Sequence, residues 1–310
     1  MEQYISLISD VLKKEHAYGY SNSVYLKQAQ YFAPEYLDFI YKILKSGSLK
    51  IKYGYLKGSA YSDYEDEMSI KLDKRQLTRL EVDLHDVEVL PHELGHAVDF
   101  WFSSLKSLTG MVILNDKGQS LFDIFKEELH EKHKELYLLV MEEYKNIINH
   151  NINDNAYDIL INNIDTYREL MSIPVNLNDK ETTKRRRKLQ NILYESGFVE
   201  MYYELFKKKS PNILNTKYAP ILDALASKYN LDDLLLIVHD NGYYKVNSRR
   251  PVQEFFANLF AAKVTNDKRY EISLRKHLPK SFEGFEKLFL IFYSHIQNNK
   301  RFNDVPIKER

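Results

Sequence analysis

The stretch Leu90-Pro91-His92-Glu93-Leu94-Gly95-His96-Ala97-Val98-Asp99-Phe100 holds an H-E-x-x-H sequence between apolar flanks typical of a buried helix. Pro91 suits the first turn of a helix, where its missing N–H loses no partner, so we expect the helix to begin there. Residues four apart share a helix face, so His92 and His96 point toward one place with Glu93 on the same turn. This is the arrangement of a catalytic zinc site: two neutral histidine ligands, an adjacent carboxylate base and an open coordination position.

Chance rarely produces this pattern. In a chain of 310 residues with 10 His, random composition gives roughly 0.02 matches. The alternative is a surface helix that carries the pattern by accident, and the apolar flanks disfavour it.

The composition limits what else can bind a metal or a partner. The chain has no cysteine, so any metal must be bound by His, Asp or Glu, and a cysteine nucleophile is excluded. The 44 Lys and Arg balance the 44 Asp and Glu, which removes the global electrostatic argument for a nucleic-acid partner. We interpret the basic run 184–188 as a solvated helix face, with a nucleic-acid patch as the alternative.

Glu254 is the leading candidate for the third metal ligand. It is a lone carboxylate in an otherwise apolar helix predicted over 251–262, and a buried charge is costly unless it is paired or bound to a metal. The alternative is a rim residue paired with Arg249 or Arg250. The remaining candidates are Glu127, His130, His133, His239 and Asp240, of which the two histidines near 130 fall on a charged, solvated helix.

Two further residues are predicted to support the ligands. Asp99 lies three residues after His96, and Asn258 lies four residues after Glu254. Each is therefore one helical turn from a ligand, where it can hydrogen-bond a ligand histidine from outside the coordination sphere.

Apolar residues at helical spacing dominate the chain, and two alternating segments, 49–55 and 68–72, predict a small sheet. We expect an α+β fold, predominantly α-helical, with a small mixed sheet and a large helical insertion. Its predicted parts are 1–115, with N-terminal helices, sheet and H-E-x-x-H helix; 116–235, the helical insertion; and 236–310, which supplies the third ligand. The strand at 68–72 is predicted to be an edge to which an extended peptide adds.

The stretch at 90–100, paired with Glu254-Phe255-Phe256-Ala257-Asn258-Leu259-Phe260, resembles the zinc metallopeptidases related to the catalytic domain of anthrax lethal factor. Similar domains occur in phage-encoded and toxin-like proteins. The resemblance implies a zincin-like metallopeptidase core of the gluzincin type. In it, His92, His96 and Glu254 bind one catalytic zinc ion and Glu93 is the general base.

The resemblance also implies a tyrosine that assists catalysis shortly before the third ligand. That role falls on Tyr243 or Tyr244, and His239 is a further candidate for steadying an oxyanion.

The sequence thus predicts a zinc-dependent endopeptidase that hydrolyses peptide bonds through a zinc-bound water activated by Glu93. Its partner would be a peptide or protein substrate, with no nucleic acid and no membrane span. The alternatives are a toxin-like or phage-encoded effector or processing protease for one partner protein, and a non-catalytic zinc-containing binding protein. No signal peptide is readable, so we expect a protein that is cytoplasmic as synthesised, with later delivery to a virion or target cell open.

Overall fold

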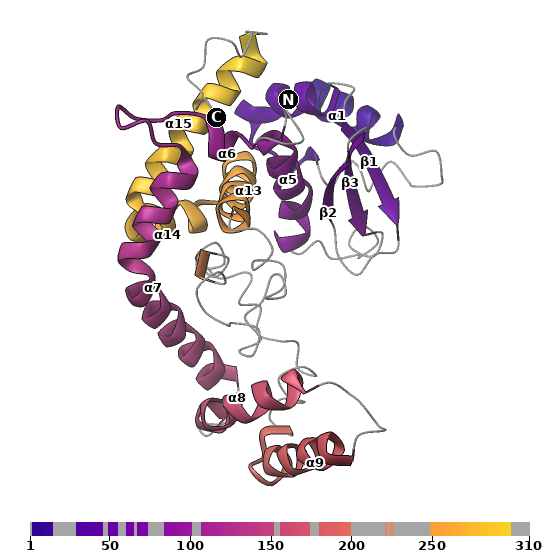
Figure 1. Cartoon of the computed structure of the whole chain (residues 1–310). Coiled ribbons are helices and arrows are strands. Elements are labelled where there is room, and N and C mark those ends of the chain that lie inside the picture. Colours follow the sequence, from indigo (N-terminus) through magenta and orange to yellow (C-terminus); the bar gives the residue numbers. More distant parts are fainter. Residues whose placement is uncertain are drawn as a thin grey trace. The chain divides into compact units, whose positions relative to one another are not determined.

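The computed structural model describes residues 2–14, 29–45, 49–54, 60–64, 67–73, 84–100, 107–151, 156–173, 180–199, 221, 224–225 and 249–298. The chain divides into two compact units (Figure 1). Unit 1 comprises Met1–Lys132 and Asn247–Arg310, and unit 2 comprises His133–Val246. The division falls inside one long helix, whereas the sequence predicts that the helical insertion begins at 116.

Unit 1 contains most of the described secondary structure. Its helices are α1 (Glu2–Lys14), the 3-10 helix η1 (Pro34–Tyr36), α3 (Leu37–Lys45), α5 (Leu84–Asp99), α6 (Leu108–Met111), the first part of α7 (Leu121–Asn151), α13 (Arg250–Thr265), α14 (Lys268–His277) and α15 (Pro279–Asn298). Its strands are β1 (Leu49–Gly54), β2 (Ala60–Tyr64) and β3 (Glu67–Asp73). Unit 2 contains the rest of α7, with α8 (Ala156–Ser172) and α9 (Lys180–Glu195).

The core of unit 1 is an aromatic cluster around α13, a helix that is buried along most of its length. Phe39 of α3 and Phe289 of α15 pack on Phe260 of α13, with ring centroids 6.1 Å and 5.8 Å from that ring. Phe256, also on α13, meets Phe285 of α15 edge-on at 5.5 Å. Tilted and edge-on pairs at these separations add to the free energy of apolar burial. The helix predicted to supply the third ligand is therefore the centre of the core.

The strands form a small sheet in the order β1-β3-β2, with β3 parallel to β1 and antiparallel to β2. Ile70 of β3 pairs with Ile51 on one side and with Tyr61 on the other. Because both sides of β3 are already paired, the prediction that the strand at 68–72 is a peptide-binding edge is wrong. In Figure 1, α5 lies between this sheet and α13, and it packs against β2, β3 and α13.

The predicted fold class, a predominantly α-helical α+β fold with a zincin-like core, is wrong, because the described residues form a mostly helical structure rather than an α+β fold. An α+β domain would use its sheet as one of the layers that enclose the core. Here helices pack on helices around α13, and Leu49, Ile51 and Ile70 of the strands are also buried. The alternating segments cover only 49–55 and 68–72, whereas helical periodicity covers most of the chain.

In unit 2, α8 and α9 are held together by part of the basic run at 184–188. Arg185 forms an ion pair with Glu169 of α8 at 2.7 Å. Arg186 donates hydrogen bonds to the carbonyls of Leu170, at 3.0 Å, and Ile173, which close the C-terminal end of α8. Two of the basic side chains therefore have a structural role between the helices.

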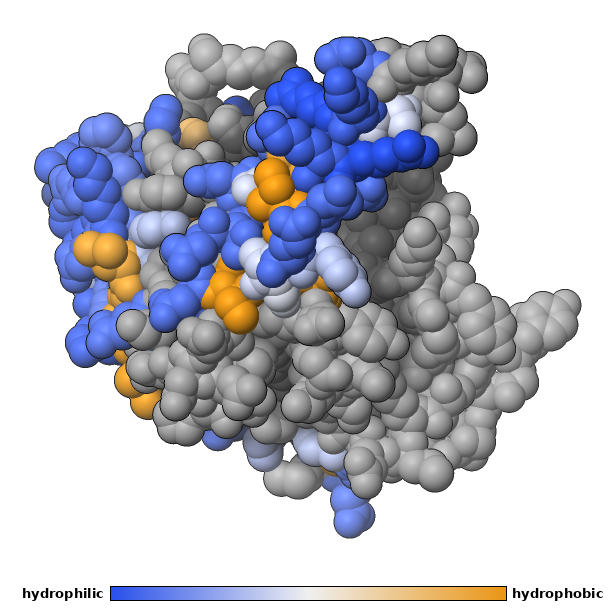
Figure 2. Space-filling model, turned by 90° about the horizontal axis from the view of Figure 1, so that it is seen from below, coloured by the Kyte–Doolittle hydropathy of each residue, from blue (hydrophilic) through white to orange (hydrophobic). Residues whose placement is uncertain are grey.

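Among the described residues, none of the helices combines the length and apolar character that crossing a membrane requires. The described surface in Figure 2 is largely hydrophilic, with small separate hydrophobic areas. The most exposed large apolar side chains are dispersed over several helices: Leu138 on α7, Tyr194 on α9, Ile272 on α14 and Leu290 on α15.

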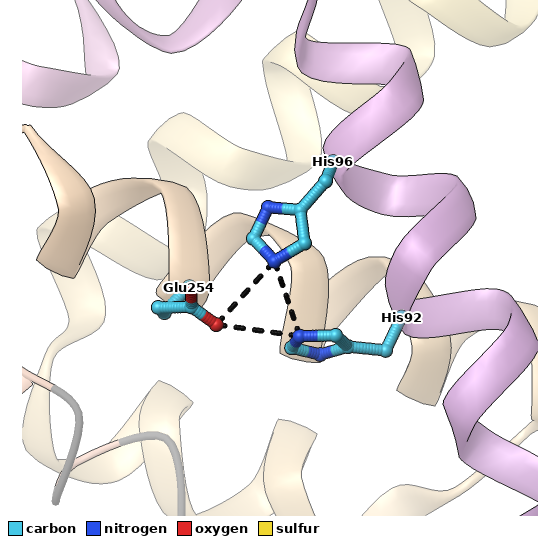
Figure 3. Close-up of side chains that lie close together, drawn as sticks. All are labelled: His92, His96 and Glu254. Carbon is cyan, nitrogen blue, oxygen red and sulfur yellow. Dashed lines mark hydrogen bonds and ion pairs between the residues drawn. The ribbon is translucent and has the colours of Figure 1, made fainter. Parts of the chain in front are cut away.

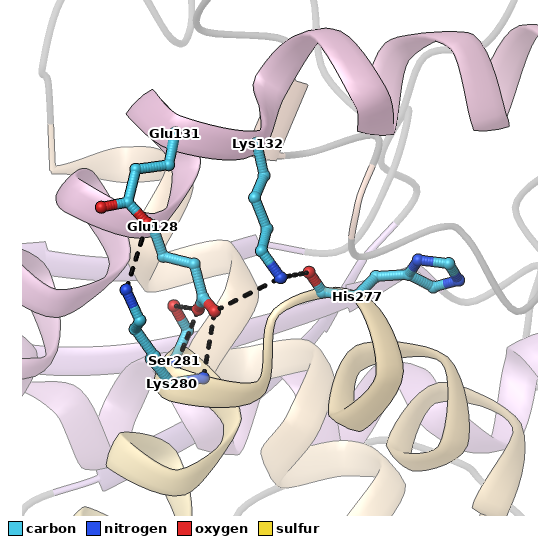
Figure 4. Close-up of polar contacts among 6 residues, drawn as sticks. All are labelled: Glu128, Glu131, Lys132, His277, Lys280 and Ser281. Atoms are coloured by element: carbon cyan, nitrogen blue, oxygen red, sulfur yellow. Dashed lines mark hydrogen bonds and ion pairs between the residues drawn. The ribbon is translucent and has the colours of Figure 1, made fainter.

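A buried carboxylate, Glu128, attaches α7 to the start of α15 (Figure 4). Its side chain is 0% exposed and accepts hydrogen bonds from the backbone N–H groups of Lys280, at 3.1 Å, and Ser281, at 2.7 Å. The Ser281 hydroxyl donates a third at 2.7 Å. Lys132, one turn later, donates to the carbonyl of His277 at 3.0 Å. Carboxylates at helix N-termini satisfy backbone N–H groups that have no partner within the helix.

We predict that Glu128→Gln lowers the free energy of unfolding by about 1–3 kcal/mol, because one acceptor oxygen becomes a donor facing buried donors. Urea denaturation followed by circular dichroism measures this change. Glu131→Gln is the matched control, since Glu131 is exposed on the same helix and pairs with Lys280 at 3.1 Å. The control should change nothing measurable, and an equal loss in both variants would contradict the role of Glu128.

Candidate metal centre

Three side chains that can hold a metal ion come together where α5 packs on α13 (Figure 3). Both imidazoles point from α5 toward the carboxylate on α13. The Nε2 atoms of His92 and His96 are 3.2 Å apart, and Oε2 of Glu254 is 3.3 Å from the first and 3.4 Å from the second. The three potential ligand atoms therefore form a nearly equilateral triangle.

The two helices are delimited in different ways. Helix α5 begins at Leu84 and contains Pro91 in its interior, so the prediction that Pro91 starts the helix is wrong. An interior proline removes one helical hydrogen bond, and here the residues before it continue the helix despite that loss. Helix α13 has proline in its first turn and ends at Thr265, where it is capped by Asn266, whose φ of 59° is left-handed.

Gly95, inside the H-E-x-x-H sequence, allows α5 and α13 to approach closely. A Cβ atom at this position would lie 2.8 Å from the Cα of Ala257 and 3.3 Å from its Cβ. It would also lie 3.2 Å from the Cβ of Phe260. The first of these distances is a backbone clash that a side-chain rotation cannot relieve. The absence of a side chain at Gly95 therefore sets how near the two histidines lie to Glu254.

The negative charges at the buried centre favour a cation there. The side chain of Glu254 is 0% exposed, and that of His96 is 11% exposed. Burial lowers the pKa of His96, but the charge and hydrogen bond of Glu254, with the charges of Glu93 and Asp99, outweigh this and raise it to about 9. A site whose carboxylates stabilise positive charge at an imidazole is suited to a bound metal cation.

The alternative in which Glu254 is a rim residue paired with Arg249 or Arg250 is wrong, because Glu254 is fully buried beside the two histidines. Glu93 is also buried, at 6% exposed, and its charge raises the pKa of His96. The structure thus brings His92, Glu93, His96 and Glu254 into one neighbourhood.

Asp99 is the last residue of α5 and is fully buried. Its carboxylate accepts hydrogen bonds from the backbone N–H of Thr109 at 2.8 Å and from the Thr109 hydroxyl at 3.2 Å. Burial raises its pKa to about 6, against these hydrogen bonds, which lower it. These hydrogen bonds therefore run to α6, whereas the sequence predicts a bond to a ligand histidine.

The other residues that the sequence proposed as ligands, supporting residues or catalytic residues lie outside the cluster or outside the described part of the chain. Asn258 is partly buried on α13, one turn after Glu254, and its supporting role stays a prediction. Glu127 and His130 are exposed on α7 and His133 is partly buried on the same helix; none of the three is in the cluster. The proposed catalytic residues Tyr243, Tyr244 and His239, with Asp240, lie outside the described residues.

Two residues near the centre were given no role by the sequence: Gly95 and Thr109. A signal was present for the first, because glycine in a helix interior is unfavourable unless a close contact requires it. Thr109 carries no comparable signal, since its hydrogen bonds to Asp99 depend on where α6 lies in space.

Comparisons with protein families, with curated proteins and with solved structures give no match to this chain. The function is therefore inferred from the residues of the centre and their geometry.

We predict that Gly95→Ala destabilises unit 1, although alanine has the higher helix propensity. Propensity alone would stabilise the helix by roughly 1 kcal/mol, whereas overpacking against the backbone of Ala257 costs about 1–3 kcal/mol or more. The sign of the change in the melting temperature therefore tests the contact. A variant that is more stable than the native protein would contradict the close approach of α5 and α13.

Proposed function

We propose that this chain is a zinc-dependent endopeptidase in which His92, His96 and Glu254 hold the metal and Glu93 is the general base. The observation that carries the proposal is the triangle of three ligand atoms, with edges of 3.2, 3.3 and 3.4 Å, in a buried cluster beside a further carboxylate. The resemblance of 90–100 and 254–260 to peptidases related to anthrax lethal factor supports the same function.

The size of the triangle supports zinc as the metal. Zinc binds imidazole nitrogen and carboxylate oxygen at about 2.1 Å in tetrahedral sites, and two ligands of such a tetrahedron are about 3.4 Å apart. Two histidines also argue against magnesium and calcium, which take oxygen ligands. Three protein ligands are what a catalytic zinc site provides when its fourth position receives water or substrate.

Glu93 is the feature that favours hydrolysis over other metal chemistry. Two histidines and one carboxylate also bind Fe(II) in oxygenases, and a structural zinc site has no need of a further carboxylate beside its ligands. In the proposed function, Glu93 takes the proton from an attacking water and delivers it to the leaving amine of the peptide. The zinc ion supplies a Lewis acid that polarises the carbonyl and lowers the pKa of the water.

The exposure of the ligands indicates the side from which a substrate approaches. The side chain of His92 is 18% exposed, whereas that of Glu254 is 0% exposed. We therefore expect the scissile bond to reach the centre from the His92 side, with the Glu254 side closed by the core around α13.

We predict that Glu93→Gln retains about one equivalent of zinc and loses activity by roughly 10²–10⁴-fold, because the amide cannot accept the proton. Cleavage of denatured casein and of a mixture of quenched fluorescent peptides measures activity, and mass spectrometry of the metal content measures zinc. Glu127→Gln, an exposed change on α7, is the matched control and should retain full activity.

Two outcomes would count against this assignment. A Glu93→Gln protein with native activity would show that Glu93 is not the base. A native protein that binds zinc but cleaves neither probe would exclude a general endopeptidase and favour a partner-specific protease or a non-catalytic zinc protein.

We predict that Glu254→Gln weakens zinc binding by more than the roughly 10–100-fold typical of residues outside the coordination sphere. Competition with a chromophoric zinc chelator measures the dissociation constant. Zinc at about 1,000 times its dissociation constant stabilises the folded state by about 4 kcal/mol. Zinc should therefore raise the melting temperature of the native protein and of Glu93→Gln, and that of Glu254→Gln by much less. An equal rise in all three would remove Glu254 from the ligand set.

A further inference from the structure

The three edges of the triangle of potential ligand atoms are of two kinds (Figure 3). The edge between the Nε2 atoms of His92 and His96, 3.2 Å long, joins two side chains of the same helix, α5. The two edges from Oε2 of Glu254, 3.3 Å and 3.4 Å long, cross from α13 to α5. The first edge therefore depends on the local geometry of α5, whereas the other two depend on how near the two helices lie to each other.

The interface between α5 and α13 is extended, and within it Gly95 makes a close approach to α13 within one turn of the ligands. Gly95 directly precedes His96, and Ala257 lies three residues after Glu254. A Cβ atom at Gly95 would lie 2.8 Å from the Cα of Ala257. Favourable contacts between carbon atoms begin at about 3.5 Å, so a side chain at this position requires the helices to separate locally by about 0.7 Å.

A separation of this size is large for a metal centre. Distances from a metal ion to its ligand atoms hold to within about 0.2 Å, and the groups of a functional site have to stay within about 0.5 Å of their working positions. The side chains of Glu254 and His96 are 0% and 11% exposed, so packing limits how far they can adjust. Phe260 of α13 also packs against Phe289 of α15, with ring centroids 5.8 Å apart, which ties α13 to the core.

We propose that Gly95 is a positioning residue for the metal ion: because it has no side chain, α13 brings Glu254 to ligand distance from His92 and His96. The inference rests on the proposed metal centre, and it assigns to this glycine a role in zinc affinity besides its role in helix packing. Gly95 acts through Glu254 and does not touch the metal ion or the substrate.

The experiment measures whether Gly95 affects zinc binding through Glu254. Gly95→Ala is made in the native chain and again in Glu254→Gln, in which both edges between the helices have already lost their carboxylate. We expect Gly95→Ala to raise the zinc dissociation constant by about 10–100-fold in the native chain. In Glu254→Gln it should raise this constant by less than about twofold, because residues that act through one another do not contribute additively. Competition with a chromophoric zinc chelator measures all four proteins.

Gly284→Ala is the matched control, because Gly284 is a buried glycine inside another helix, α15. A Cβ atom there would have as nearest neighbours the Cδ1 atoms of Leu121, Ile124 and Leu114, at 3.1, 3.5 and 3.6 Å. These atoms are the ends of flexible side chains, and none of them belongs to α5 or α13. Gly284→Ala should therefore change the zinc dissociation constant by less than about twofold in both backgrounds, whatever its effect on the melting temperature.

Three results would overturn the proposal: native zinc affinity in Gly95→Ala, an equal loss of affinity in both backgrounds, or an equal loss in Gly284→Ala. Should Gly95→Ala fail to unfold cooperatively, Glu254→Asp decides, because it withdraws the carboxylate by one methylene and adds no atom at the interface. We expect Glu254→Asp to raise the zinc dissociation constant by about 10–100-fold as well, and native affinity in this variant would also overturn the proposal.

Failure of the metal centre and failure of the positioning role give different results. A native protein that binds no zinc would overturn the proposed metal centre, and this inference with it. A native protein that binds zinc but cleaves no peptide would contradict the endopeptidase function, and the dissociation constants would then decide the role of Gly95 by themselves.

Discussion

The packing of α5 on α13 at Gly95 and Ala257 is the contact on which the rest of unit 1 depends. A side chain at Gly95 would meet the backbone of α13 at 2.8 Å, so the two helices can be this close only because glycine has no Cβ. The same α13 carries Phe256 and Phe260 into the aromatic core and Glu254 toward the histidines. The core and the candidate metal centre therefore both contain side chains of α13, so a displacement of this helix would move both.

Three fully buried carboxylates show how unit 1 accommodates charge away from water: Asp99, Glu128 and Glu254. Glu128 faces two backbone N–H groups and a hydroxyl at the start of α15, with the ammonium of Lys132 3.9 Å away, and Asp99 faces a backbone N–H and a hydroxyl. These partners account for a structural role of both carboxylates. The Oε2 atom of Glu254 faces two imidazole nitrogens instead, and that difference in partners, more than burial itself, makes it the candidate metal ligand among the three.

Much of the candidate site could be predicted from sequence, because its strongest signals are local. The spacing of His92, Glu93 and His96 within one helix is a property of four consecutive peptide units, and Glu254 was recognisable as an isolated charge in an apolar helix. The fold class was predicted less well: alternation at 49–55 and 68–72 indicates strands but not how much of the core they build. The edge assignment of the strand at 68–72 failed for the same reason, since sheet order depends on partners distant in sequence.

The sequence by itself determined which residue types can carry the chemistry. The lack of cysteine restricts ligands to His, Asp and Glu, and helical periodicity aligns two histidines with a neighbouring carboxylate. Only the tertiary structure decided that Glu254 lies 3.3 and 3.4 Å from those histidines, that Gly95 makes this possible, and that Asp99 accepts hydrogen bonds from Thr109. The physical reason is that a local pattern specifies the face of a helix, whereas the partner of that face is selected by packing across the whole core.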